Sequence, residues 1–77
     1  MSESQEIIFM QARLLRLASN NWKMTIQNAG SIFFKYGLLA LIRDCYDMFH
    51  TEGDEAVLEE MEKILKHKGV DVHAEID

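Results

Sequence analysis

The sequence has no proline, no repeat and no low-complexity stretch, and its 77 residues include four glycines and a single cysteine. A chain of this length has room for one domain, and no linker divides it. The lone Cys45 cannot form an internal disulfide, which agrees with a reducing compartment. The longest apolar run, GLLALI, is far too short to cross a bilayer, and the first residues lack the basic and apolar regions of a signal peptide. We therefore expect a soluble cytoplasmic protein that does not enter a membrane.

Positive charge is also scarce, because the chain has eight Lys and Arg but thirteen Asp and Glu, which gives a net charge of −5. A phosphate backbone repels such a chain unless its cations share one face. The cations are spread along the chain, which argues against nucleic acid as a partner. The sequence shows no glycine-rich phosphate loop, nucleophile elbow or serine-histidine-aspartate order, so we expect no enzyme and no cofactor.

The composition, with 48% hydrophobic and 27% charged residues, is too apolar for a disordered chain. Apolar residues recur at helical spacing from near Ser4, which predicts a first helix over roughly 4–20. Thr25 is a natural N-cap for a second helix, and Gly37 is placed to end it as a left-handed residue. A third helix is expected over 38–49, with Asp44 and Asp47 opposite its apolar face.

Thr51 and Asp54 resemble a capping box that introduces the clearest helix of the chain, with Gly69 as its C′ residue. Val70 is placed to pack back on Leu65, as in a Schellman motif. These signals predict an all-α fold, a compact four-helix domain over residues 1–69 with a short C-terminal tail over 70–77. A chain this short buries only about 60% of its unfolded surface, so its core is small and self-association is a plausible support.

Cys45 and His50 are the residues that first suggest chemistry. Cys45 falls at the centre of the apolar face of the third helix, where a free cysteine behaves as a small hydrophobe. His50 follows near the helix end, where a histidine can meet the last carbonyl groups. The other interpretation makes the two residues metal ligands, but a second pair at zinc-site spacing is missing. We expect a buried Cys45 and no bound metal.

The acidic first half of the last helix admits two interpretations, paired carboxylates for acid–base catalysis or a solvated face that suits the helix dipole. We prefer the solvated face, because paired catalytic carboxylates need a pocket that perturbs their pKa values. The second helix, Gly37 and the third helix outline a helix-turn-helix, so a small DNA-binding regulator is the alternative function. Against it, the exposed side of the third helix offers Arg43 beside Asp44 and Asp47, a poor reader of a major groove.

Phe9 falls on the polar side of the first helix, next to Arg13 and Arg16. One interpretation is a surface ring stacked under an arginine, and the other is an anchor for a protein partner flanked by cations. The apolar arc of this helix spans about half its circumference, with Phe9 beyond it. A small helical domain gains stability when a second chain covers such extra apolar surface, which predicts a homodimer through the first helix.

The tail alternates strictly between apolar and polar side chains, with Val70, Val72, Ala74 and Ile76 on the apolar side. Period two is typical of a strand, and the domain offers no sheet to receive one. Two interpretations of the tail remain. It is either a frayed acidic terminus or a docking strand that becomes ordered on the sheet edge of a partner. The docking interpretation makes Val70, Val72 and Ile76 candidate protein-binding residues.

The stretch FKYGLLALIRDCYDMFHTEGDEAVLEEMEKIL carries a joint pattern. It contains a lysine-tyrosine-glycine turn at 35–37, a tyrosine-aspartate pair at 46–47, a histidine-threonine junction at 50–51, Gly53 and an acidic last helix. In this pattern the chain resembles a bacterial family of small proteins known as domain of unknown function 3791, over about residues 5 to 66. The resemblance implies a compact helical domain with no established activity or cofactor. Some members are encoded beside proteins similar to ADP-ribosyltransferases, so it also implies an accessory or neutralising partner role.

Overall fold

The first helix begins at a capping box in the computed structural model, which describes residues 2–73. Helix α1 spans Glu3–Asn21, and Ser2 is its N-cap. The Ser2 hydroxyl accepts from the Gln5 backbone N–H at 3.3 Å, and the Gln5 side-chain oxygen accepts from the Ser2 N–H at 3.3 Å. These two reciprocal bonds satisfy backbone donors that the first turn leaves free. The predicted start near residue 4 is therefore correct to about one residue.

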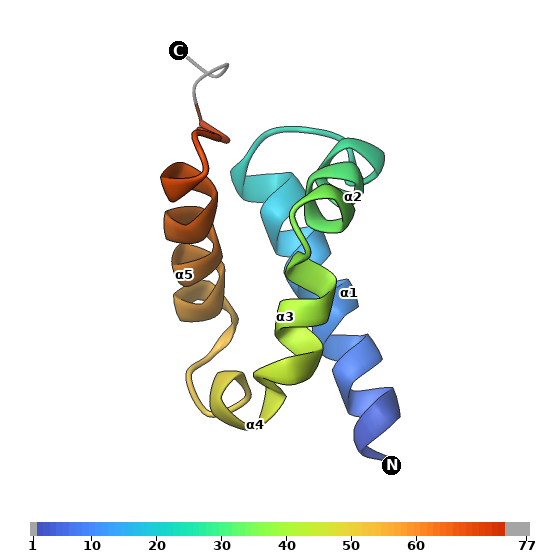
Figure 1. Ribbon diagram of the computed structural model, residues 1–77. Coiled ribbons are helices and arrows are strands. Elements are labelled where there is room, and N and C mark those ends of the chain that lie inside the picture. Colours follow the sequence, from blue (N-terminus) through green and yellow to red (C-terminus); the bar gives the residue numbers. More distant parts are fainter. Residues whose placement is uncertain (1, 74–77) are drawn as a thin grey trace.

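Helix α1 is the helix against which α2, α3 and α5 all pack (Figure 1). Met10, Leu14 and Ala18, four residues apart, are buried along one face. The helix closes at Trp22, and the Met24 N–H donates to the Ser19 carbonyl at 3.1 Å. The residue between them, Lys23, has a left-handed backbone with φ of 54°, a conformation that glycine usually supplies at a helix end.

Helix α2 spans Ile26–Lys35 and starts where the sequence predicted. The Thr25 side chain accepts a hydrogen bond from the Asn28 N–H at 3.1 Å, so Thr25 is the N-cap. Ala29 and Phe33 point into the core. Gly37 follows with φ of 70°, which confirms its predicted left-handed role in turning the chain from α2 into α3.

The predicted helix over 38–49 is two helices, α3 over Leu38–Asp44 and α4 over Tyr46–Phe49. The prediction of one continuous helix was wrong because Cys45, with φ of −105° and ψ of 16°, leaves the helical conformation. No glycine or proline marks this position in the sequence. The break accompanies burial of Phe49, which is 3% exposed at the end of α4. Tertiary packing, and not local sequence, therefore sets the bend.

The predicted capping box at Thr51 and Asp54 is also absent. Helix α5 spans Asp54–His67 and begins after Gly53, whose φ is 93° and which has no side chain to cap the helix. The Thr51 hydroxyl instead donates to the Met48 carbonyl at 2.8 Å. Thr51 comes directly after the C-cap of α4, where the free carbonyl groups at the end of that helix accept from its hydroxyl.

The end of α5 agrees with the prediction. Gly69 has φ of 83°, its N–H donates to the Lys66 carbonyl at 3.0 Å, and the Val70 N–H donates to the Leu65 carbonyl at 2.9 Å. These two bonds define a Schellman motif. The chain then turns back, so that the first part of the tail meets the body of the protein.

Residues 70–73 form a turn and contain no strand. Val70 is half-buried, and Val72 is 8% exposed and belongs to the hydrophobic core. This part of the tail thus packs on the chain's own helices, which differs from the expected free terminus or docking strand. The remainder of the tail, including Ile76, lies outside the described residues.

All regular structure within residues 2–73 is helical, so the all-α prediction is confirmed, with five helices in place of the four expected. No helix in that range combines the length and apolarity that a bilayer crossing requires. The core contains one contiguous set of buried apolar side chains from every helix and the tail, namely Met10, Leu14, Ala18, Trp22, Ala29, Phe33, Leu38, Ile42, Phe49, Val57, Leu58, Met61, Leu65 and Val72.

Candidate protein-binding surface

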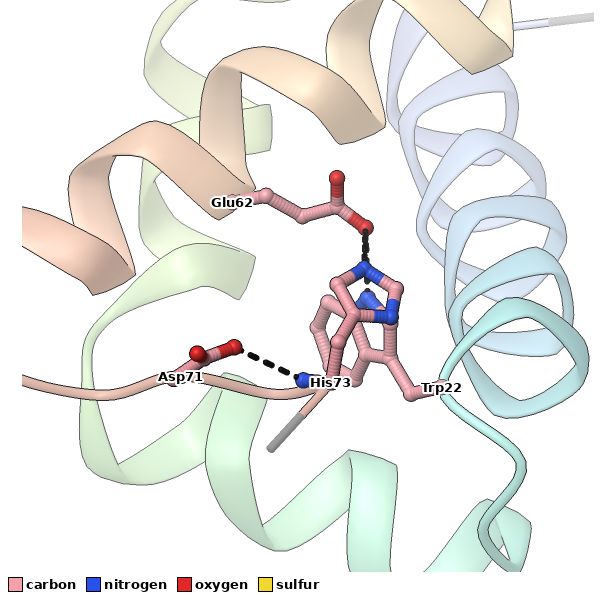
Figure 2. Close-up of polar contacts among 4 residues, drawn as sticks. All are labelled: Trp22, Glu62, Asp71 and His73. Atoms are coloured by element: carbon pink, nitrogen blue, oxygen red, sulfur yellow. Dashed lines mark hydrogen bonds and ion pairs between the residues drawn. The ribbon is translucent and has the colours of Figure 1, made fainter. Parts of the chain in front are cut away.

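A polar cluster of Trp22, Glu62 and His73 joins three parts of the chain (Figure 2). The indole N–H of Trp22 donates to Oε2 of Glu62 at 2.7 Å, and Nε2 of His73 lies 3.3 Å from the same oxygen. The backbone N–H of His73 donates to Asp71 at 3.0 Å, which holds the turn of the tail. The cluster therefore links the end of α1, the middle of α5 and the tail.

The chemistry of this cluster is that of a structural link. Indole is a donor that keeps its proton, so the Trp22 N–H fixes Glu62 as an acceptor. Trp22 is 1% exposed, and an unpaired buried N–H would destabilise the fold. Glu62 satisfies that donor at the surface of the core. This role accounts for the carboxylate without any substrate.

Cys45 and His50 have structural partners of their own. Nδ1 of His50 lies 2.9 Å from the Tyr46 carbonyl, and the two rings stack with centroids 5.0 Å apart. The predicted contact of His50 with the last carbonyl groups of its helix is confirmed. Cys45 is half-buried against the core, so its expected burial is met only in part. Across residues 2–73, no three His, Cys, Asp or Glu side chains form a group suited to a metal ion.

Of the predicted cationic binding residues, Arg13 is held by α5. Its guanidinium donates to both carboxylate oxygens of Asp54, at 2.9 and 3.4 Å. The hydrogen bond with Asp54 and the charge of that carboxylate raise the pKa of Arg13 above its ordinary value, while desolvation opposes them. The pair ties α1 to α5. Phe9, 49% exposed, and Arg16 remain on the outer face of α1.

Two carboxylates approach each other between the α4–α5 junction and α5. Desolvation, a hydrogen bond with Glu60 and the charge of Glu60, in that order, raise the pKa of Glu52. Both side chains are exposed. The acidic face of α5 is therefore solvated, as the sequence predicted, and it repels a further anion.

Five large apolar side chains are about half exposed or more: Ile8, Phe9, Ile26, Phe34 and Met48. Phe34 is the extreme case, with 82% of its surface exposed. The sequence reasoning missed it, although a signal was present. Phe33 and Phe34 are neighbours on a helix, where successive side chains point about 100° apart. Since Phe33 is fully buried, Phe34 must point away from the core.

Two contacts join α1 to α2 and to the start of α3. The Leu15 side chain of α1 approaches Gly30 of α2, with Cδ1 3.9 Å from where a Cβ on that glycine would lie. The Gln11 amide of α1 donates to the Leu39 carbonyl, beyond the end of α2, at 2.9 Å. The first contact places the middle of α2 against Leu15, and the second places the start of α3 against Gln11, one turn earlier on α1.

The apolar side chains of this α1–α2 seam line up on the two helices. Ile8 lies seven residues before Leu15, and Phe34 lies four residues after Gly30, so each shares a face with the residue at the contact. Ile26 lies four residues before Gly30 on the same stripe. We call these five residues, Ile8, Leu15, Ile26, Gly30 and Phe34, the seam patch. Phe9 follows Ile8 on α1 and adjoins the patch.

The seam patch lies in a segment without negative charge. None of the thirteen acidic residues, and five of the eight cations, fall between residues 7 and 43. Sequence reasoning noted that the cations are scattered but missed this gap in the anions. Within α2 the cation is Lys35, whose ammonium lies 5.5 Å over the Tyr36 ring. The patch itself is therefore apolar and nearly neutral, in contrast with α5.

Comparison with known proteins identifies a family for this chain. The family model described as "Protein of unknown function (DUF3791)" matches residues 9–68. No curated protein and no solved structure matches the chain. The matched range covers α2 to α5 and all of α1 from Phe9 onward, so the seam patch apart from Ile8 falls within it.

Proposed function

Because the chain belongs to the DUF3791 family of proteins of unknown function, we propose that it is a small protein-interaction module that acts by binding another protein and not by catalysis. The partner is either a second copy or a different protein. In the second case the accessory or neutralising role implied by the sequence resemblance fits this proposal.

The observation that carries the proposal is the 82% exposure of Phe34 within the seam patch. Single exposed apolar residues are normal on soluble proteins. Here Ile26 and Phe34 share one face of α2 with Gly30, and Ile8 shares one face of α1 with Leu15, which contacts Gly30. Burying a phenylalanine side chain contributes about 1.5–3 kcal/mol, a gain that the isolated chain leaves unused. Aromatic anchors of this kind dominate the energetics of protein interfaces.

The polar groups support binding over catalysis. Glu62 is engaged by the buried indole of Trp22, and His50 is engaged by the Tyr46 carbonyl. Each of these side chains has a structural role that explains its position. A catalytic acid or base needs a group aimed at a substrate in a concave site. The seam patch offers contact area and apolar anchors, which suit a protein surface.

Site-directed photo-cross-linking tests the proposal. Benzoylphenylalanine is introduced at position 34 in the native host, and at exposed position 63 of α5 as the control. We expect a covalent adduct with a protein, whether this chain or another, from position 34 and not from position 63. Absence of a protein adduct at position 34, together with salt-dependent binding of the purified chain to random duplex DNA, would overturn the proposal in favour of a nucleic-acid-binding function.

A further inference from the structure

We propose that residues 70–73, which we call the tail strap, open and close over the Trp22 end of the core while the five helices stay folded. This inference concerns the chain alone and does not depend on the proposed function. Three observations carry it: the few contacts that hold the strap, the hollows on both sides of it, and the partner that the Trp22 indole keeps when the strap leaves.

Few contacts hold the tail strap on the helices (Figure 2). At its start, the Val70 N–H donates to a carbonyl group of α5 at 2.9 Å. Beyond Val70, no backbone–backbone hydrogen bond within the described chain joins the strap to a helix. The Asp71 carboxylate bonds to the His73 N–H, which lies in the strap itself. Closure therefore depends on the buried Val72 side chain and on the contact of His73 with Glu62, whose side chains are 50% and 24% exposed.

Hollows border the strap on both sides. One, of about 420 Å³, lies between the strap and the α1–α2 turn, with Met24 and Ile32 in its wall. The other, of about 370 Å³, lies between the strap and α5, with Lys63 and Lys66 in its wall. A segment with open space on both sides has few neighbours to lose when it moves. Such sparse packing is typical of segments that open at a lower free energy than global unfolding.

Opening of the strap leaves the buried indole N–H satisfied. Oε2 of Glu62 accepts from the Trp22 indole at 2.7 Å and lies 3.3 Å from Nε2 of His73, so one oxygen serves both the core and the strap. Glu62 belongs to α5, and its bond to Trp22 remains when His73 moves away. An unpaired buried donor would oppose opening, and none is created. The main cost of opening is thus the exposure of one valine side chain.

A strap also accounts for the alternation of apolar and polar residues in this part of the tail. Val70 and Val72 pack against the core, and Asp71 and His73 are exposed. An extended segment that crosses a protein surface needs one apolar side, as a strand on a core does, whether or not it pairs with a sheet. The period of two in residues 70–73 is therefore the sequence signal of the strap.

Native-state thiol labelling tests the strap with matched variants. Val72→Cys places a thiol in the strap, Val57→Cys places one at a fully buried position of α5, and Ser31→Cys places one at an exposed position of α2. Peptide mass spectrometry separates each added thiol from Cys45, the single cysteine of the chain. Without denaturant, position 72 should react at least about tenfold more slowly than position 31 and at least about tenfold faster than position 57.

The dependence on urea separates local from global opening. Low concentrations of urea should raise the labelling rate at position 57 and leave the rate at position 72 nearly unchanged, because opening of the strap exposes little surface. Adding His73→Ala to the Val72→Cys variant removes a half-exposed polar contact and should speed labelling at position 72 by about two- to fivefold. The control is His67→Ala, an exposed histidine of α5, which should not change that rate.

Two outcomes would overturn the inference. If position 72 reacts at the rate of position 57, with the same rise in urea, the strap opens only when the whole chain unfolds. If position 72 reacts at the rate of position 31, the strap is not closed over the core. Far-UV circular dichroism of each variant checks that its helices are folded during labelling.

Discussion

The indole N–H of Trp22 donates a 2.7 Å hydrogen bond to the carboxylate of Glu62, although the two residues are 40 positions apart in the sequence. The bond joins the end of α1 to the middle of α5 and satisfies a donor that is otherwise enclosed by the core. Trp22 is 1% exposed with Glu62 in place, so the carboxylate is the partner that this buried donor has in the folded chain.

Replacing Glu62 with alanine should leave that buried donor unpaired. We expect Glu62→Ala to lower the free energy of unfolding by about 2 kcal/mol, as measured by urea denaturation at fixed protein concentration. Glu62→Gln keeps an acceptor oxygen and should cost less than about 1 kcal/mol. The control is Glu59→Ala, an exposed glutamate one turn earlier on α5. Equal effects of the alanine substitutions at 59 and 62 would contradict the structural role of the bond.

The tail contributes to stability through Val72. This side chain is 8% exposed and packs with the core, so its truncation should create a cavity beside the helices. We expect Val72→Ala to lower the free energy of unfolding by about 2 kcal/mol. Lys66→Ala, at an exposed position of α5, should change it by about 0.5 kcal/mol or less. This expectation differs from the free terminus or docking strand that the sequence suggested. An unchanged melting temperature in Val72→Ala would contradict the packing of the tail on the core.

Lys23 has a left-handed backbone that a side chain disfavours. With φ of 54° at the end of α1, it occupies the position that Gly37 and Gly69 occupy after α2 and α5. Lys23→Gly should therefore raise the free energy of unfolding by about 1 kcal/mol. The matched control is Lys35→Gly in the last position of α2, where the backbone is helical and the same change should lower stability by about 0.5 kcal/mol. Thermal melts of both variants measure the two changes, which should be opposite in sign. A lower stability of Lys23→Gly would contradict the strain proposed for the Lys23 backbone.

The pKa of Glu52 should lie above the ordinary value of a glutamate. Desolvation and then the hydrogen bond and charge of Glu60 favour its protonated form in the folded chain, which raises its pKa. The contribution of Glu52 to stability is therefore present below the pKa of the unfolded chain and lost as the pH rises through the folded pKa. NMR titration of the side-chain carboxyl should show a lower midpoint in Glu60→Gln than in the original chain. Glu55→Gln should not move it, and a midpoint indifferent to Glu60 would disprove the pairing.

The features that sequence predicted correctly are local ones. Thr25 caps α2, and Gly37 and Gly69 are left-handed after α2 and α5, because a few adjacent backbone groups determine each of these positions. Two of the errors lie in the α3–α5 region and have different causes. At Cys45 the helix breaks as Phe49 enters the core, which is a tertiary effect. At Thr51 two local bonds compete, because the hydroxyl bonds back to Met48, three residues earlier, and leaves α5 uncapped.

The candidate surface was predicted less completely than the fold. Phe9 was recognised because a helical wheel places it opposite the buried face of α1, and its 49% exposure agrees. The seam patch could not be recognised in the same way, since it depends on which face of α2 meets Leu15 of α1. That pairing comes from tertiary packing. The adjacent Phe33 and Phe34 were the local clue that one large ring must face outward.

The packing of α1 against α5 also bears on how the protein is made. A chain leaves the ribosome from its N-terminus, so α1 is synthesised before the helix that covers it. Asp54 and Glu62, the partners of Arg13 and Trp22, both lie in α5. The nascent α1–α3 segment therefore carries uncovered apolar side chains until α5 has emerged. A product that stops short of α5 cannot complete this core, and we expect cellular quality control to recognise it as unfolded.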